Sequence, residues 1–261
     1  MKNNKMGLAQ KIRSKIPDNI RSHFQAFRGG TSPSPLDIER TEEIFYINYL
    51  QEGMTVYDVG ANIGELTLLF SRFVGQHGRV FSFEASKDTF KKLNAVTGFA
   101  HRNNIVINHL ALTDKVGSVK LTVYTDEYAS WNSLANRPLE SYGIDVKPVR
   151  FEDVPSSTID VFSIEHNITY IDLLKIDVEG AEYQVMLGAQ KMLQEKRVGC
   201  CIFEFGGTTF DMGNTPEMIE SFLANMGYRI RNIVNGAKSF PGREGAKFAK
   251  FSMQIAEPIK S

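Results

Sequence analysis

The stretch VYDVGANIG, residues 56–64, combines residue types and spacings that suit the binding of a small ligand. A short apolar run contains Asp58, and Gly60, Asn62 and Gly64 follow it at once. A glycine-rich turn between a strand and a helix lets the backbone approach a ligand closely and directs free helix N–H groups toward an anion. The stretch therefore predicts a site for a nucleotide-like cofactor.

Two common phosphate-binding patterns fit this turn poorly. In the dinucleotide pattern G-x-G-x-x-G the central glycine admits a pyrophosphate, and here Asn62 occupies its place. A P-loop requires a Gly-Lys-Ser/Thr run, which does not follow this turn. A dehydrogenase is thus a disfavoured alternative.

Two acids at the ends of successive predicted strands narrow the choice of cofactor. Asp58 precedes the turn, and Glu84 ends the next strand, where a carboxylate can accept hydrogen bonds from two ribose hydroxyls. S-adenosylmethionine offers an amino-acid end for the turn, a ribose for Glu84, and sulfonium and ammonium groups for the acids. We therefore predict this cofactor, although a tight turn with a solvent-facing acid is the simpler structural alternative.

Further acids follow later strands of the predicted sheet. Ligands of open α/β sheets bind beyond the carboxyl ends of the strands, and Asp177 and Glu204 also lie at such ends. We predict that Asp177 contacts the cofactor and that Asp177 and Glu179 act as general bases in catalysis. Helix capping and dipole compensation are the alternatives for these two residues. His109, His166 and Glu204 are further candidates for the base.

The segment SWNSL, residues 130–134, contains the only tryptophan of the chain. An aromatic ring beside amide and hydroxyl groups suits the stacking of a sugar, so Trp131, Asn132 and Ser133 are predicted to contact the substrate. The alternative is a loop anchored by the burial of Trp131. The segment belongs to a long irregular stretch, from about 125 to 156, of the kind that often covers a binding site.

The elements that must position these residues alternate between short β-rich runs and helical stretches. This alternation predicts an α/β fold, with a mostly parallel sheet and helices on both faces. The predicted strands include 54–59, 79–85, 104–112, 171–178 and 198–205, with closing strands near 228–234 and 247–255. Helices are predicted over 65–74, 86–99, 180–193 and 215–227, and a hairpin over 113–124.

Composition limits the partners and the compartment. The chain has 261 residues, with 30 basic and 30 acidic side chains, so its formal net charge is zero. A nucleic-acid partner is therefore not expected, because phosphate neutralisation needs an excess of Lys and Arg. The two cysteines, Cys200 and Cys201, lie in an apolar run and suggest no disulfide framework or metal site. With no transmembrane segment or secretory signal apparent, a cytoplasmic protein is expected.

The N-terminal residues are predicted to form a segment separate from the main domain. Basic residues dominate 1–28, and apolar residues recur at every fourth position from Leu8 to Phe24, as in an amphipathic helix. Packing on the domain is the favoured interpretation, and peripheral contact of 8–27 with a membrane is the alternative. The connector GGTSPSPLD, 29–37, predicts an N-terminal helix and linker over 1–35 and one domain over 36–261.

Several motifs resemble the FkbM family of S-adenosylmethionine-dependent methyltransferases. They are VYDVGANIG, FSFEAS, LALTD and, most specifically, LLKIDVEGAEYQVMLGA, and the similarity runs from about 53 to 234. The resemblance implies a class I methyltransferase fold with a Rossmann-like, seven-stranded sheet whose last strand is antiparallel. It also implies methylation of a hydroxyl on a sugar, glycan or secondary metabolite. Asp58, Gly60, Asn62 and Gly64 match the first cofactor motif and Glu84 the ribose acid, while Ala111 and Leu112 fall where adenine rests.

The sequence thus predicts an O-methyltransferase acting on a small-molecule or glycan hydroxyl. Methylation of nitrogen, of a protein or of a lipid, and a cofactor-binding module without activity, are the alternatives. Asp177 stands where some related O-methyltransferases bind magnesium, but the sequence shows no clear partner ligand, so no metal is predicted. The oligomeric state is left undetermined by the sequence.

Overall fold

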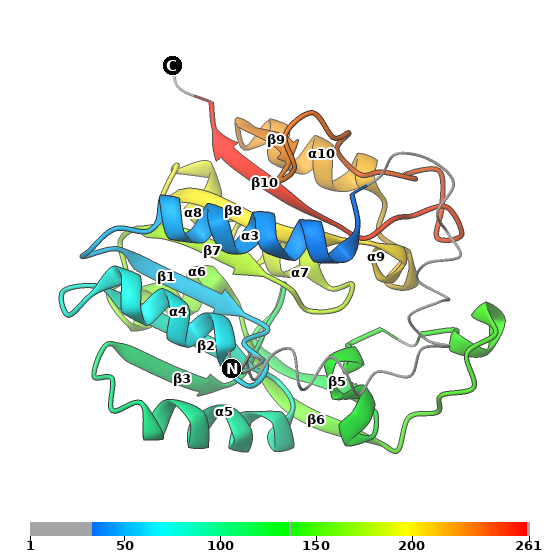
Figure 1. Cartoon of the computed structure of the whole chain (residues 1–261), viewed down its shortest axis with the longest axis horizontal. Coiled ribbons are helices and arrows are strands. Elements are labelled where there is room, and N and C mark those ends of the chain that lie inside the picture. Colours follow the sequence, from blue (N-terminus) through cyan, green and yellow to red (C-terminus); the bar gives the residue numbers. More distant parts are fainter. Residues whose placement is uncertain (1–32, 136, 260–261) are drawn as a thin grey trace, which may run out of the picture. The chain divides into compact units, whose positions relative to one another are not determined.

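The computed structural model describes residues 33–135 and 137–259 (Figure 1). Their compact unit begins at Pro33, close to the predicted domain boundary. The predicted N-terminal helix, including residues 8–27, lies outside the described residues. Across the part of the chain that is described, no helix is both long and apolar enough to cross a membrane.

The first described helix, α3 (Pro35–Tyr49), begins inside the predicted connector. Ser34 caps it: the Ser34 hydroxyl accepts from the Asp37 N–H, and the Asp37 carboxylate accepts from the Ser34 N–H. Pro35 occupies the first helical position, where a missing N–H does no harm. The sequence analysis interpreted this proline-rich stretch as a connector, whereas its last residues begin a helix.

Seven strands form the main sheet in the order β3-β2-β1-β7-β8-β10-β9. The pairings among β3, β2, β1, β7 and β8 are parallel, whereas β10 is antiparallel to both of its neighbours. The strands are β1 (Thr55–Val59), β2 (Arg79–Glu84), β3 (Ile105–His109), β7 (Ile171–Ile176), β8 (Val198–Phe205), β9 (Tyr228–Asn232) and β10 (Ser252–Pro258). The predicted seven-stranded sheet with an antiparallel last strand is confirmed.

Alternating strand residues bury two different faces of this sheet. Val56 belongs to the apolar cluster with α3 and α4 (Glu65–Val74), while Tyr57 belongs to the cluster on the other face. Helices of that second face are α6 (Ile159–Glu165), α7 (Glu182–Leu187), α8 (Gln190–Gln194) and α10 (Pro216–Asn225). The helix α5 (Lys87–Phe99) packs on β2 and β3 (Figure 1). Helices on both faces, as predicted, leave the carboxyl ends of the parallel strands for a ligand.

The predicted helix 180–193 is broken at Gly188, between α7 and α8. A Cβ atom at Gly188 would lie 2.0 Å from the carbonyl oxygen of Thr113, so the chain approaches its neighbour closely there. The Asp160 carboxylate accepts from the N–H groups of Lys191 and Met192 and so caps the N-terminus of α8. A long-range capping residue of this kind leaves no local pattern in the sequence.

A second sheet contradicts the predicted hairpin over 113–124. Its strands β4 (Ala111–Leu112), β5 (Gly117–Val123) and β6 (Arg150–Ser157) lie in the order β4-β6-β5. Because β5 pairs with β6, the irregular stretch ends at about residue 149 and holds two short 3-10 helices, η1 (Asp126–Trp131) and η2 (Leu139–Tyr142). Ser133 then bridges back to Thr122 of β5, which folds the segment after η1 toward the main sheet.

Candidate active site

The turn between β1 and α4 accepts only glycine at two positions. Gly60 has φ +79°, and a Cβ atom there would lie 1.8 Å from the carbonyl oxygen of Asp177. Gly64 has φ +91°, and its Cβ would lie 2.7 Å from Cδ1 of Leu93. Between them Asn62, with φ 50°, adopts the left-handed backbone that asparagine tolerates better than most residues. The turn is thereby pressed against the end of β7, with Gly60 and Asn62 on the wall of a cavity.

A buried lysine beneath this turn was missed by the sequence analysis. The Lys175 ammonium donates to the carbonyl oxygen of Gly60 at 3.1 Å and lies 3.5 Å from carboxylate oxygens of both Asp58 and Asp177. Burial alone would lower the pKa of Lys175, but the charges of Asp177 and Asp58 outweigh it and raise that pKa. A lysine in the middle of the apolar run LLKI was the available signal, because such a charge needs partners.

Asp58 forms an ion pair with Lys175. It is fully buried, its Oδ2 accepts from the Thr67 hydroxyl at 2.6 Å, and its Oδ1 faces Lys175. Asp58 does not line the cavity described below. Its placement therefore supports a role in shaping the turn, rather than the direct contact with a ligand that the sequence analysis predicted.

Glu84 ends β2 beside the turn and lines the same cavity as Gly60 and Asn62. Its Oε2 accepts from the Asn62 N–H at 3.0 Å and its Oε1 from the Ser86 N–H at 2.8 Å. Burial raises the pKa of Glu84 to about 7 against these hydrogen bonds. Because an ionised carboxylate has about four acceptor positions, two remain for hydroxyl donors of a ligand.

The cavity has a volume of about 130 Å³ and lies at the carboxyl ends of the parallel strands. Its lining includes the predicted residues Gly60, Asn62, Glu84, Ala111, Leu112, Asn132, Ser133, Asp177 and Glu179. Leu110, Ala111 and Leu112 also line the cavity, and the Leu110 N–H donates to the Glu84 carbonyl oxygen. Residues predicted from five separate sequence regions thus meet at one cavity.

The two histidines considered as bases are engaged elsewhere. The His109 ring stacks on Phe90 with centroids 5.1 Å apart, and its Nε2 lies 3.0 Å from the Ala85 carbonyl oxygen. The His166 ring stacks on Phe162 at 3.8 Å and lies outside the cavity. Both placements fit packing roles better than proton transfer.

Three carboxylates converge beside the cavity. Among the described residues, oxygens of Asp177, Glu179 and Glu204 lie within 4.8 Å of one another, close enough to hold one metal ion. Burial, together with the charges of Glu179 and Asp177, raises the pKa of Glu204 well above its usual range, and the Glu204 carboxyl hydrogen-bonds to Asp177. Burial also raises the pKa of Glu179 to about 8. Asp177 thus has two partner acids, which the sequence analysis could not identify.

Glu182 organises the turn that carries Asp177 and Glu179. Its Oε1 accepts from the N–H groups of Val178 at 3.0 Å and Gly180 at 3.1 Å, and burial raises its pKa to about 7. Glu179 itself has φ 56°, a left-handed backbone that is strained for a residue with a side chain. The turn is therefore held in an unfavourable conformation that directs Glu179 toward the cavity.

Of the three residues predicted to contact the substrate, two line the cavity and one packs outside it. Asn132 and Ser133 line the cavity; the Asn132 Oδ1 accepts from the Tyr124 N–H, and the Ser133 hydroxyl donates to the Glu179 carbonyl oxygen at 2.7 Å. The Trp131 ring instead packs on Tyr128, with centroids 5.0 Å apart, and does not line the cavity. For Trp131, the structure favours the anchored-loop alternative.

Comparison with known proteins assigns the chain to a family. The model described as "Methyltransferase FkbM domain" matches residues 58–230 of the chain. The chain belongs to the FkbM methyltransferase family. The match spans the whole site of this FkbM domain, from Asp58 of β1 through Glu204 of β8.

Individual relatives of this FkbM methyltransferase are distant. The chain is 29% identical over 161 residues to the 31-O-demethyl-FK506 methyltransferase FkbM of Streptomyces tacrolimicus, and the match covers 54% of this chain and 61% of that protein. Among solved structures, it resembles methyltransferase FkbM from Methylobacillus flagellatus, with 13% identity, a TM-score of 0.47, and coverage of 91% of this chain and 60% of the other. A putative rRNA methylase from Clostridium thermocellum gives 14% identity, a TM-score of 0.47, and coverage of 89% and 99%.

S-adenosylmethionine is the cofactor of this FkbM domain. The residues present fit it: Gly60 and Asn62 of the glycine turn line the cavity, and Glu84 retains acceptor positions for ribose hydroxyls. The backbone at 110–112 offers a wall for the adenine. The cofactor supplies an activated methyl group, so the residues of the chain have to bind and orient an acceptor.

Proposed function

We propose that this protein methylates a hydroxyl group of a sugar, a glycan or a secondary metabolite. The observation that carries the proposal is that Asp177 and Glu179 line the same cavity as Glu84 and the glycine turn, with the Glu204 carboxyl beside them. An alcohol must lose its proton as it accepts a methyl group, and a positioned carboxylate can remove it. Two such carboxylates, Asp177 and Glu179, line this cavity and support the proposal.

Asp177 and Glu179 are the residues proposed to do this. Both line the cavity, and the pKa of Glu179, raised to about 8 by burial, makes its ionised form a stronger base than an ordinary carboxylate. The Ser133 hydroxyl holds the Glu179 backbone, and the buried Lys175 holds Asp177. These contacts orient the two acids before an acceptor binds.

The chemistry of the cavity wall supports a neutral polar acceptor. Ser130 and Asn132 line it beside Ala129 and Leu134, which gives hydrogen-bonding groups next to apolar surface. The relative from Streptomyces tacrolimicus is named for methylation of an oxygen. A zero net charge supports a small molecule or glycan rather than a nucleic acid, and two free, buried cysteines support a reducing compartment such as the cytoplasm.

The first test is calorimetric titration with S-adenosylhomocysteine, with NAD as the comparison ligand. We expect micromolar binding of S-adenosylhomocysteine alone. A screen of sugars, glycan intermediates and polyketide alcohols then follows, with deuterium-labelled methyl donor and mass spectrometry of the products. Labelled ether products support the proposal, whereas label recovered on nitrogen, on a protein or in a lipid overturns it.

Substitutions of the two acids test whether methyl transfer depends on this site. Asp177→Asn and Glu179→Gln are expected to reduce methyl transfer by about 100-fold or more while changing S-adenosylhomocysteine affinity by less than about threefold. Glu217→Gln, an exposed acid on α10, is the control and should leave both unchanged. Methyl transfer at the wild-type rate by both site variants would remove these acids from the mechanism.

A further inference from the structure

Arg137 is a nearly buried cation that no prediction from the sequence included. Its side chain is 9% exposed, and Nη1 lies 3.4 Å from Oε2 of Glu179. On its other side, Nε lies 3.6 Å from Oδ2 of Asp211, which ends α9 (Gly207–Asp211). A buried guanidinium is costly to desolvate, so its position reflects these two carboxylates.

The same guanidinium contacts the segment before it. The Cζ atom of Arg137 lies 5.4 Å from the centroid of the Trp131 ring, within the range of a cation–π interaction. Trp131 packs in turn on Tyr128, so the end of η1 rests on a residue that is held by the active site. Arg137 therefore links the aromatic pair of the loop to Glu179.

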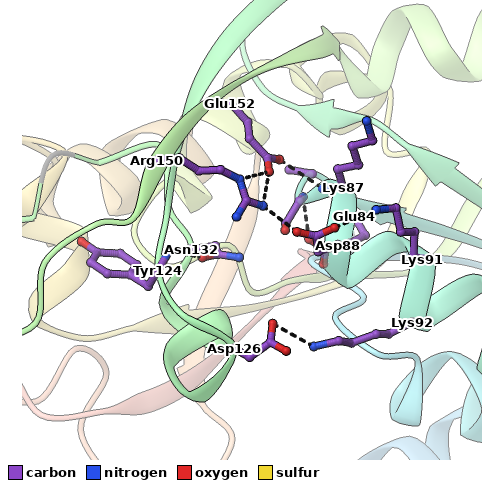
Figure 2. A network of polar contacts seen from close by, with 12 residues as sticks. Glu84, Lys87, Asp88, Lys91, Lys92, Tyr124, Asp126, Asn132, Arg150 and Glu152 are labelled. Atoms are coloured by element: carbon purple, nitrogen blue, oxygen red, sulfur yellow. Dashed lines mark hydrogen bonds and ion pairs between the residues drawn. The ribbon is translucent and has the colours of Figure 1, made fainter.

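Other contacts fix this segment at its two ends. Asp126, at the start of η1, pairs with Lys92 of α5 at 3.2 Å, and Asn132 accepts from the Tyr124 N–H (Figure 2). The Lys92–Asp126 pair is exposed and contributes little. Ser133, by contrast, is fully buried and joins Thr122 of β5 to the carbonyl oxygen of Glu179.

The segment that is held in this way forms one wall of the cavity. Ala129, Ser130, Asn132, Ser133 and Leu134 all line it, opposite the glycine turn and Glu84. Ser133 anchors one end of this wall to the site, and the packing of Trp131 against Arg137 holds the part in which η1 ends.

We propose that Arg137 is a positioning residue that holds the Asp126–Leu134 wall of the cofactor cavity closed by joining Trp131 to Glu179 and Asp211. Loss of this link opens the wall and exposes Trp131. The inference concerns the cofactor cavity and does not rest on the proposed O-methylation.

Because Trp131 is the only tryptophan, its emission reports on this wall alone. The experiment compares the full-length wild type with Arg137→Gln and Arg137→Lys, using Trp131 emission, acrylamide quenching and calorimetric titration with S-adenosylhomocysteine. Arg231→Gln is the control, because Arg231, like Arg137, pairs with an acid, Glu257, and lies over an aromatic ring, Phe45, but on the outer strands of the sheet.

In Arg137→Gln we expect red-shifted emission, about twofold faster quenching, and S-adenosylhomocysteine affinity weakened by about threefold to tenfold. Arg137→Lys keeps the charge without the planar fork and should recover part of each effect. Wild-type emission and affinity in Arg137→Gln, or equal changes in Arg231→Gln, would overturn the proposal.

A measurement on the wild type keeps the inference testable if Arg137→Gln does not fold. Saturation with S-adenosylhomocysteine should change Trp131 quenching with a midpoint equal to the calorimetric dissociation constant, because the held segment lines the cavity. Binding without any change at Trp131 would contradict the proposal. Neither arm needs a methyl acceptor, so a failure here is distinct from a failure of the proposed O-methylation.

Discussion

The Lys175 ammonium donates a hydrogen bond to the carbonyl oxygen of Gly60 at 3.1 Å. This contact joins the central strand β7, which pairs with β1, to the turn that forms the cofactor site. A backbone carbonyl in a left-handed turn is thus held by a buried charge, which Asp58 and Asp177 in turn compensate. The site is built on an ion cluster in the core.

Lys175→Met should destabilise the protein strongly. It leaves the fully buried carboxylate of Asp58 without its cation, and breaking a buried pair in this way costs about 3–5 kcal/mol. Urea unfolding of the apo protein measures the change in the free energy of unfolding. Lys91→Met, which removes an exposed pair with Asp88, is the control and should cost less than about 1 kcal/mol. Equal losses in both variants would contradict the core role of Lys175.

Glu84→Gln should weaken cofactor binding by about tenfold or more, as expected for losing about 1.5–3 kcal/mol of charged hydrogen bonding. Gln keeps the size of Glu84 but offers one acceptor oxygen, and the N–H groups of Asn62 and Ser86 already compete for it. Calorimetry with S-adenosylhomocysteine measures the effect. Glu152→Gln is the matched control, because Glu152 accepts from the Lys87 N–H at the same end of α5 but does not line the cavity (Figure 2). Unchanged affinity in Glu84→Gln would place the ribose elsewhere.

Cofactor affinity should also depend on pH through Glu84. Burial raises its pKa to about 7, and only the ionised form accepts from all of its neighbours and from ribose hydroxyls. We expect S-adenosylhomocysteine affinity to fall as the pH decreases from about 8 to about 6. Glu84→Gln should flatten this dependence; a steep dependence that survives the substitution would assign it to another group.

The apo protein should lose stability as the pH rises from about 5 to about 8. Burial raises the pKa of Glu182 to about 7 and that of Glu179 to about 8, so the folded state holds protons that the unfolded chain has released. Stability from such groups is complete below the unfolded pKa and is lost as the pH passes the folded pKa. Thermal unfolding across this range measures the slope. Glu182→Gln should reduce the slope, whereas Glu217→Gln should not, because the pKa of Glu217 is lowered by Arg243.

The sheet and half of the site were predictable because they leave local patterns. Helix α4 was predicted with the bounds that the structure has, and so was strand β8, since each combines a regular apolar period with clear ends. The glycine turn and Glu84 were found by their place at strand ends. Strand ends in a parallel sheet share one edge, so these residues had to meet.

The remaining parts depend on contacts between distant segments. Arg137 and Lys175 were overlooked because their roles come from burial beside acids up to 117 positions away, which Lys175 and Asp58 illustrate. Glu182 was overlooked because only the folded turn shows that its side chain accepts from the N–H groups of Val178 and Gly180. Strand β6 was read as irregular because its alternation is weak, and only its pairing with β5 makes it a strand. The helix α3 was hidden by a proline-rich start that resembles a linker.

Glu204→Gln should be tolerated, in contrast to most substitutions of buried charged residues. The pKa of Glu204 is raised by burial and by Glu179 and Asp177, so its carboxyl is protonated and hydrogen-bonds to Asp177, and an amide can replace it. We expect S-adenosylhomocysteine affinity within about twofold of the wild type and a melting temperature within about 3 °C. Thermal unfolding with magnesium or with EDTA is part of the same experiment, because oxygens of Asp177, Glu179 and Glu204 are close enough to hold a cation.

A proton and a divalent cation compete for the same carboxylates. If the proton bridges Glu204 and Asp177 as inferred, neither magnesium nor EDTA should change the melting temperature of the wild type. Stabilisation of the wild type by magnesium, lost in Glu204→Gln, would show instead that the three acids bind a metal. In that case the acceptor hydroxyl would meet a cation at the cavity, and the roles proposed for Asp177 and Glu179 would change from removing its proton to holding the ion.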